Sequence, residues 1–238
     1  MPFPRLASQS SVMIPWVHLD VASIPGGGEL RLMRRGQEFA IRLGQNDLMN
    51  SRLSGSEEAL ATLTAARIME RPAPHILIGG LGMGFTLRAA LASLNASAKI
   101  VVAELVPQVV EWARGPMAEV FRGCLDDPRV SVKVEDVRKS IASVSSVYDA
   151  ILLDVDNGPE ALTHAGNDRL YDWNGLGLAR AALRPGGLLA VWSSGPDDGF
   201  TQRLRKARFD VEEVRIKANA GRSGARHVIW LASRSKTG

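Results

Sequence analysis

Apolar and polar residues alternate over the first fifty positions in the pattern of half-buried strands. The alternating stretches are 16–24, 29–34 and 38–43, and glycine-containing turns at 25–28 and 35–37 separate them. Strands this few and this short bury too little apolar surface to be stable alone. We therefore predict an N-terminal β-hairpin or meander that ends near residues 51–52 and packs against the rest of the chain.

A helical period replaces this alternation after residue 54. Apolar side chains recur every three or four residues from Leu60 to Met69, which predicts one buried stripe along a helix. Ser54 or Ser56 can cap the helix. The glutamates at 57 and 58 then lie in its first turn, where the positive end of the helix dipole favours them.

From residue 76 onward, short apolar strands alternate with helices. The predicted strands are 76–78, 100–103, 130–134, 150–154 and 188–193, and the predicted helices are 85–94, 107–121, 137–144 and 176–183. This alternation indicates a parallel sheet with helices on both faces. The last two predicted strands, 209–214 and 227–232, have no helix between them, so we expect an antiparallel hairpin at the end of the sheet.

The segment 75–91, HILIGGLGMGFTLRAAL, joins a buried strand to a helix through Gly80, Gly82 and Gly84. Glycines reach positive φ and allow a ligand to lie against main-chain N–H groups, and the helix start adds unsatisfied donors. The spacing differs from the G-x-G-x-x-G dinucleotide fingerprint. Glu104 ends the next strand, where a carboxylate can accept hydrogen bonds from ribose hydroxyls. The pattern favours an S-adenosylmethionine-type ligand; a turn whose glycines serve packing alone is the alternative.

The other strand ends of the predicted sheet add further polar side chains to the same edge. Asp136 can accept a hydrogen bond from an adenine amino group or cap the helix that follows it. Asp154, Asp156 and Asn157 follow the fourth strand. A carboxylate that faces a sulfonium can hold a cationic amine and take up its proton, whereas a solvated acidic loop is the plainer interpretation. Tyr171 lies in a later loop that can cover the pocket.

Composition narrows the class of protein. The chain is 45% hydrophobic and 23% charged, as globular proteins are. No apolar run approaches the roughly 18 residues that span a bilayer, and the first residues lack the apolar core of a signal peptide. The single cysteine, Cys124, excludes an internal disulfide and a cysteine-based zinc site. We expect a cytoplasmic protein that binds neither a metal nor a membrane.

The net charge of +4 is unevenly distributed. From Arg203 onward, the chain has ten lysines and arginines but only three acidic residues. Such a basic face can meet RNA, but it lacks the interleaved aromatic residues on which bases stack. We interpret it as solvated surface and expect no nucleic-acid partner.

With these motifs assembled, the chain resembles the polyamine aminopropyltransferases, the spermidine and spermine synthases, from about residue 36 to residue 192. GGLGMGFTLR is similar to the glycine-rich loop of that family, and VVAELVPQVVEWAR to its second-strand acid and the following helix. DPRVSVKVEDVRKSI resembles its Asp-Pro-Arg-Val…Asp segment, and YDAILLDVDNGP its fourth-strand acidic motif. LMNSRLSGSEEAL resembles the segment that joins the family's β-domain to its first helix.

The expected fold is therefore α/β, a doubly wound Rossmann-like sheet of the class I methyltransferase type with a C-terminal antiparallel hairpin. This catalytic domain spans 54–238, and a small N-terminal β-domain spans 1–53. The resemblance implies an amine acceptor, decarboxylated S-adenosylmethionine as the second substrate, and a homodimer. It implies that Glu104 binds the ribose of the donor, that Asp136 binds its adenine, and that Gly80, Gly82 and Gly84 bind the rest of it. It implies that Asp154 accepts the amine proton, with Asp156 beside it. The acceptor contacts that it implies are Asn157, Glu58 and Tyr171.

Three positions depart from the pattern of that family. Met83 stands where the glycine loop carries an aspartate that holds the aminopropyl ammonium group, and Asn157 where the acidic motif has a second aspartate. Ser56 or Glu57 stands where a tyrosine precedes the first-helix glutamate. Aminopropyl transfer is the leading hypothesis. The alternatives are a methyltransferase that uses S-adenosylmethionine itself and a non-catalytic nucleotide-binding module.

Overall fold

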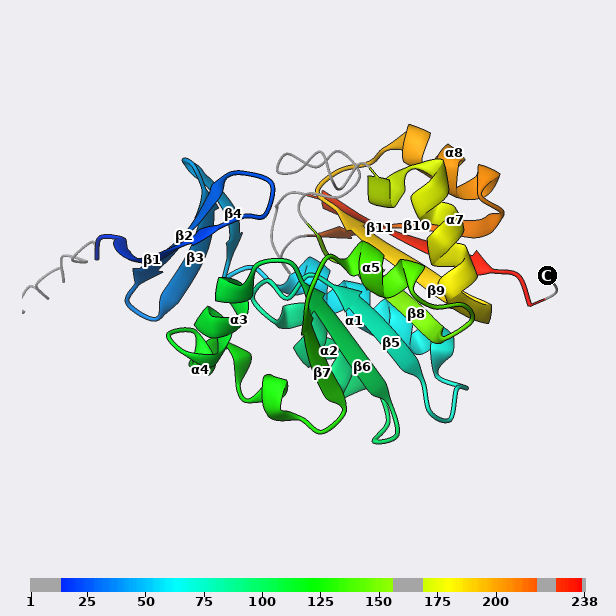
Figure 1. The fold of residues 1–238 in the computed structure, drawn as a ribbon, viewed down its shortest axis with the longest axis horizontal. Coiled ribbons are helices and arrows are strands. Elements are labelled where there is room, and N and C mark those ends of the chain that lie inside the picture. The colour runs from blue at the N-terminus through cyan, green and yellow to red at the C-terminus, as the bar shows by residue number, and fades with distance from the viewer. Residues whose placement is uncertain (1–13, 156–168, 218–225, 237–238) are drawn as a thin grey trace, which may run out of the picture.

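Four antiparallel strands form the first sheet of the computed structural model, which describes residues 14–155, 169–217 and 226–236 (Figure 1). They are β1 (Val17–Ser23), β2 (Glu29–Arg35), β3 (Glu38–Leu43) and β4 (Asn46–Asn50), paired in the order β1-β2-β3-β4. The predicted N-terminal meander is confirmed, and β4 extends it by one strand.

Seven strands form the second sheet, in the order β10-β11-β9-β8-β5-β6-β7. Their bounds are β5 (His75–Gly79), β6 (Lys99–Glu104), β7 (Val130–Val134), β8 (Tyr148–Leu153), β9 (Leu183–Ser193), β10 (Phe209–Lys217) and β11 (Arg226–Arg234). β5 to β9 pair in parallel, whereas β11 is antiparallel to both β9 and β10. The predicted doubly wound sheet and its C-terminal antiparallel hairpin are confirmed.

Helices cover both faces of this sheet because successive strand residues alternate between them. The helices are α1 (Gly55–Ile68), α2 (Phe85–Ser93), α3 (Pro107–Arg114), α4 (Ala118–Phe121), α5 (Val137–Ala142), α7 (Trp173–Ala182) and α8 (Asp198–Lys206), with the short 3₁₀ helix η1 (Cys124–Asp126). Ile76 and Ile78 of β5 pack in one core cluster with α1, α2 and α3. Leu77 packs in the other, with α5, α7 and α8.

Two predicted elements differ from the structure, and one helix was not predicted. The predicted helix 107–121 is split into α3 and α4 at Gly115, because Pro116 disfavours helical geometry at the residue before it. The segment 184–187, which has the composition of a turn, belongs to β9. α8 was not predicted, although Asp197 accepts from the Phe200 N–H at 2.8 Å as a regular helix cap.

The N-terminal sheet packs on the larger one beside α3. Leu30 and Ile41 are buried in the same core cluster as α2 and α3, and the indole Nε1 of Trp112 donates to Asp20 Oδ2 at 2.7 Å. β4 ends at Asn50 and α1 begins at Gly55, and the domain division between residues 53 and 54 stays a prediction. Within the described ranges, no helix is long and apolar enough to cross a membrane.

Candidate active site

A cavity of about 280 Å³ lies between the two sheets, at the edge where β5, β6 and β8 end. The large sheet and its loops contribute five of the predicted site residues, Gly80, Gly82, Glu104, Asp136 and Asp154. The opposite wall is apolar and comes from the N-terminal sheet and its turns: Ile24, Pro25, Leu30, Ile41, Leu48 and Met49. The cavity is adjacent to the β5–β8 boundary, where the strand order reverses and ligands of open α/β sheets bind.

The three loop glycines are required for different reasons. A Cβ on Gly80 (φ +90°) would lie 2.3 Å from the Asp154 backbone oxygen, and one on Gly84 would lie 2.5 Å from the Phe121 ring. Packing therefore requires both. Gly82 (φ +51°) borders the cavity, and a Cβ there would approach Met49 Sδ at 3.4 Å. Of the three, Gly82 is the position where a side chain would take up ligand space.

Glu104 is buried at the end of β6 and holds the backbone on both sides of the cavity floor. Its Oε2 accepts from the Leu81 N–H at 2.8 Å, and its Oε1 accepts from the Val106 N–H at 2.9 Å. Glu104 thus has a structural role beside any ligand role.

Asp136 caps α5, because its Oδ1 accepts from the Arg138 N–H at 2.8 Å. It also lines the cavity. Both interpretations of this residue, helix cap and ligand contact, are compatible with its position.

Asp154 directly follows β8 and is partly buried. The Thr86 hydroxyl donates to its Oδ2 at 2.6 Å and also lies 3.3 Å from the backbone oxygen of Glu57. Burial, and then the negative charge of Glu57, raise the pKa of Asp154 to about 7, against the opposing Thr86 hydrogen bond. No cation of the described residues lies within ion-pair distance of it. Asp149, by contrast, lies on β8 itself and contacts Arg184 at 2.8 Å and Arg71 at 3.5 Å.

A hydrogen-bonded chain leads from Glu57 to β11. The Ser56 hydroxyl donates to Glu57 Oε2 at 2.7 Å, and His227 Nδ1 lies 2.8 Å from the same hydroxyl oxygen. Because a hydroxyl has one proton, Ser56 must accept from His227, which places the histidine proton on Nδ1. The His227 ring packs edge-on against Trp192, at 4.9 Å between centroids. His227 was not predicted as a site residue, because it lies 171 residues from Ser56 in the sequence and no local pattern marks it.

Two of the predicted residues that the structure describes, Glu58 and Tyr171, do not line this cavity. Glu58 is exposed and lines a different cavity, between α1 and α2. Tyr171 is buried in the core, where its ring packs against Phe200. Asp156 and Asn157 lie outside the described residues. The roles of these four residues stay predictions.

This sheet order, the glycine loop after β5 and the acidic residues at the carboxyl ends of β6 and β8 define a Rossmann-like protein of the methyltransferase type. Within that class, the chain belongs to the spermine/spermidine synthase domain family, whose model matches residues 57–196.

Curated relatives match about half of the chain. Polyamine aminopropyltransferase 2 of Pseudomonas aeruginosa is 33% identical over 126 residues, which cover 51% of this chain and 34% of that protein. The polyamine aminopropyltransferase of Mycobacterium tuberculosis is 33% identical over 127 residues, which cover 52% of this chain and 23% of that protein. The matched segment therefore spans about a third or less of these relatives' length.

Solved structures share the fold over a longer stretch. Spermidine synthase from Thermotoga maritima superposes with a TM-score of 0.73 at 19% identity, covering 92% of this chain and 73% of that chain. A precorrin-6y C5,15-methyltransferase from Geobacter metallireducens gives a TM-score of 0.52 at 13% identity, covering 73% and 86%. At these identities the likeness shows the fold alone.

Proposed function

We propose that this chain transfers an aminopropyl group from decarboxylated S-adenosylmethionine to an amine. The observation that carries the proposal is Asp154, a partly buried carboxyl on the wall of the inter-sheet cavity, with a pKa near 7 and Glu57 close by. A general base works best when its pKa is near the working pH. The family and the names of the relatives support the choice of reaction.

The inter-sheet cavity supplies groups that suit an adenosyl donor. In the proposal, Glu104 accepts hydrogen bonds from the ribose hydroxyls, and Asp136 accepts one from the adenine amino group. The apolar wall around Ile24 and Leu30 excludes water from the donor. Gly82 leaves room for the donor beside the loop.

The acceptor amine has an ordinary pKa near 10, so it arrives as an ammonium ion. Asp154 and Glu57 attract this cation, and Asp154 takes one proton from it. The freed nitrogen lone pair attacks the aminopropyl carbon that is bonded to the sulfonium. The carbon–sulfur bond breaks, its electron pair stays on sulfur, and methylthioadenosine leaves. Most of the acceleration comes from holding the two reactants in line at contact distance.

Methyl transfer from S-adenosylmethionine is a second candidate because of Met83. This side chain is 4% exposed and places no charge in the glycine loop. A carboxylate-bearing donor therefore meets no repulsion there, whereas an aspartate at this position would repel it.

One incubation separates the two reactions. The enzyme is mixed with each donor in turn and with a panel of mono- and diamines, and the products are identified by mass spectrometry. Methylthioadenosine with an amine enlarged by an aminopropyl group supports our proposal, and S-adenosylhomocysteine supports methyl transfer. Absence of both products, with no calorimetric binding of either donor, contradicts both. The homodimer and the cytoplasmic location stay predictions, of which gel filtration with light scattering tests the first.

A further inference from the structure

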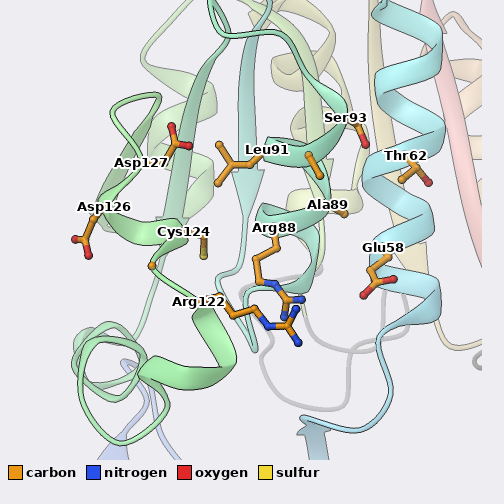
Figure 2. Close-up of a pocket in the computed structure, with 12 residues that line it drawn as sticks. Glu58, Thr62, Arg88, Ala89, Leu91, Ser93, Arg122, Cys124, Asp126 and Asp127 are labelled. Carbon is orange, nitrogen blue, oxygen red and sulfur yellow. The ribbon is translucent and has the colours of Figure 1, made fainter.

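A second and larger cavity, of about 690 Å³, opens between α1, α2 and the segment that follows α4. It shares no lining residue with the inter-sheet cavity. Figure 2 shows its side chains, with Glu58 and Thr62 on α1, Arg88 on α2 and Arg122 at the end of α4. None of the residues proposed to bind the donor contributes to it.

Arg88 is held in place from two sides. Its Nη1 donates to the Val120 backbone oxygen at 3.0 Å, and its guanidinium carbon lies 5.6 Å from the centroid of the Phe85 ring. A guanidinium fixed in this way loses little conformational entropy when it binds a ligand. The charge is nevertheless uncompensated, since no carboxylate of the described residues lies within ion-pair distance of Arg88.

Arg122 adds a second positive charge to the same cavity. It is exposed, and within the described part of the chain its side chain makes neither a hydrogen bond nor an ion pair. Its side chain and that of Arg88 point toward the same part of the opening in Figure 2. Two guanidinium groups that share a cavity repel each other unless an anion joins them.

The acids around the cavity do not neutralise this pair. Asp126 binds Arg114 at 2.9 Å, and Asp127 binds Arg129 through two bonds of 2.9 and 3.0 Å. Both carboxylates are thus engaged by arginines that do not line the cavity. Glu58 remains, on the opposite wall, and makes no ion pair with a described residue.

We propose that this cavity binds a small phosphate-bearing molecule, with the phosphate between Arg88 and Arg122. Guanidinium groups bind phosphate oxygens through paired, charge-assisted hydrogen bonds. The Thr62 hydroxyl on α1 donates to the Ala59 backbone oxygen at 3.3 Å and can accept from the uncharged remainder of the ligand, and the Ser93 hydroxyl lies on the α2 side. This inference does not rest on the proposed transferase reaction, because Arg88 and Arg122 hold the phosphate and neither lines the inter-sheet cavity.

The test is calorimetric titration of the full chain with pyrophosphate at low salt. We expect wild-type binding to be weakened at least about tenfold in Arg122→Gln, since a hydrogen-bonded ion contact is lost. Glu58→Gln should bind more tightly than wild type, because it removes the negative charge opposite the phosphate. Arg31→Gln is the matched control: Arg31 is also exposed and makes no ion pair with a described residue, but lies on β2, away from the cavity.

Four outcomes overturn the inference: no binding at millimolar pyrophosphate, unchanged binding in Arg122→Gln, an equal loss in Arg31→Gln, or citrate binding as tightly as pyrophosphate. Either of the first two results would show that the site does not exist. An equal loss in Arg31→Gln would show that binding depends only on net charge, and equally tight citrate binding would show that the cavity does not prefer phosphate. Arg122→Gln leaves all described hydrogen bonds intact, so its result does not depend on a loss of folding. Circular dichroism of each variant verifies this.

Discussion

At the scale of single residues, surroundings decide what a carboxylate can do. Asp149 and Asp154 lie five positions apart at opposite ends of β8. Asp149 is buried between two arginines, which suits a fixed ion-pair network. Asp154 has a hydroxyl and another carboxylate as neighbours, which suits a group that gains and loses a proton. The sequence places Asp154 at the functional edge of the sheet, but it does not show that Asp149 is paired with arginines and that Asp154 is not.

Asp154→Asn should change how stability depends on pH. Because folding raises the Asp154 pKa from 3.8 to about 7, its contribution to the free energy of unfolding is fully present below about pH 4 and is lost as pH rises to about 7. Asparagine does not ionise, so the variant does not lose unfolding free energy in this way as the pH rises. Between pH 5 and pH 8 we expect it to gain about 2–3 kcal/mol relative to wild type, measured by urea unfolding. A constant difference across this range would contradict the raised pKa.

The same substitution should abolish most turnover if the proposed transfer is correct. Asparagine keeps the size of aspartate but cannot accept a proton, and loss of a general base costs about 10²–10⁴ in rate. Donor affinity should change little, because Glu104 and the glycine loop are proposed to carry it. Steady-state kinetics with the true acceptor and donor calorimetry test both parts. Turnover within a few-fold of wild type would remove Asp154 from the mechanism.

Gly82→Ala should weaken donor binding at least tenfold, because the added Cβ enters the inter-sheet cavity toward Met49. Alanine at positive φ also costs about 1–2 kcal/mol of stability. Gly44→Ala is the control, since Gly44 has φ +60°, no atom lies within 4 Å of where its added methyl group would be, and it lines neither cavity. Equal donor affinity in the two variants would show that the ligand does not contact the loop.

At the scale of secondary structure, local sequence patterns predict most helices and strands. They do not predict which residues of other elements each one contacts. Alternation identified β1 to β3, and short apolar runs identified most strands of the large sheet. Helical spacing identified α1 and α2, but the buried face of α1 includes Ala61, Ala65 and Ile68, and Met69 at the end of the predicted stripe is exposed. α8 was missed although Phe200 and Leu204 have helical spacing after an aspartate cap. The rotation of α1 decides which glutamate faces the site. The resemblance implies Glu58 as the acceptor contact, but the charge of Glu57 is the one that acts on Asp154. One residue along a helix turns a side chain by about 100°, which a motif match does not resolve.

The contact between α1 and β11 gives a prediction at this scale. Ser56→Ala removes the hydroxyl that orients Glu57 and joins it to His227. We expect the KM for the amine to rise about tenfold with little change in kcat, because the lost interaction binds ground state and transition state alike. Ser54→Ala is the control, since Ser54 makes no side-chain capping bond. A fall in kcat alone would contradict a positioning role for Ser56.

At the scale of the whole molecule, the two sheets form one cavity between them. The strand pattern predicted that the N-terminal strands must pack on something else, and they do. It could not predict which face they would cover, because that depends on contacts between residues far apart, such as Trp112 with Asp20. The apolar wall of the cavity was therefore not foreseen from the sequence.

Because both sheets line the inter-sheet cavity, a ligand bound there contacts both sheets at once. A ligand that touches Met49 on one side and Glu104 on the other stabilises the docked sheet by mass action. Methylthioadenosine should therefore slow amide hydrogen exchange in β2, β3 and β4, although these strands carry none of the polar donor contacts. Exchange protection confined to the loops after β5 and β6 would contradict this. Slowed exchange in the three strands would mean that the N-terminal sheet covers the occupied cavity, and that the free energy of its opening sets how fast the nucleoside product escapes.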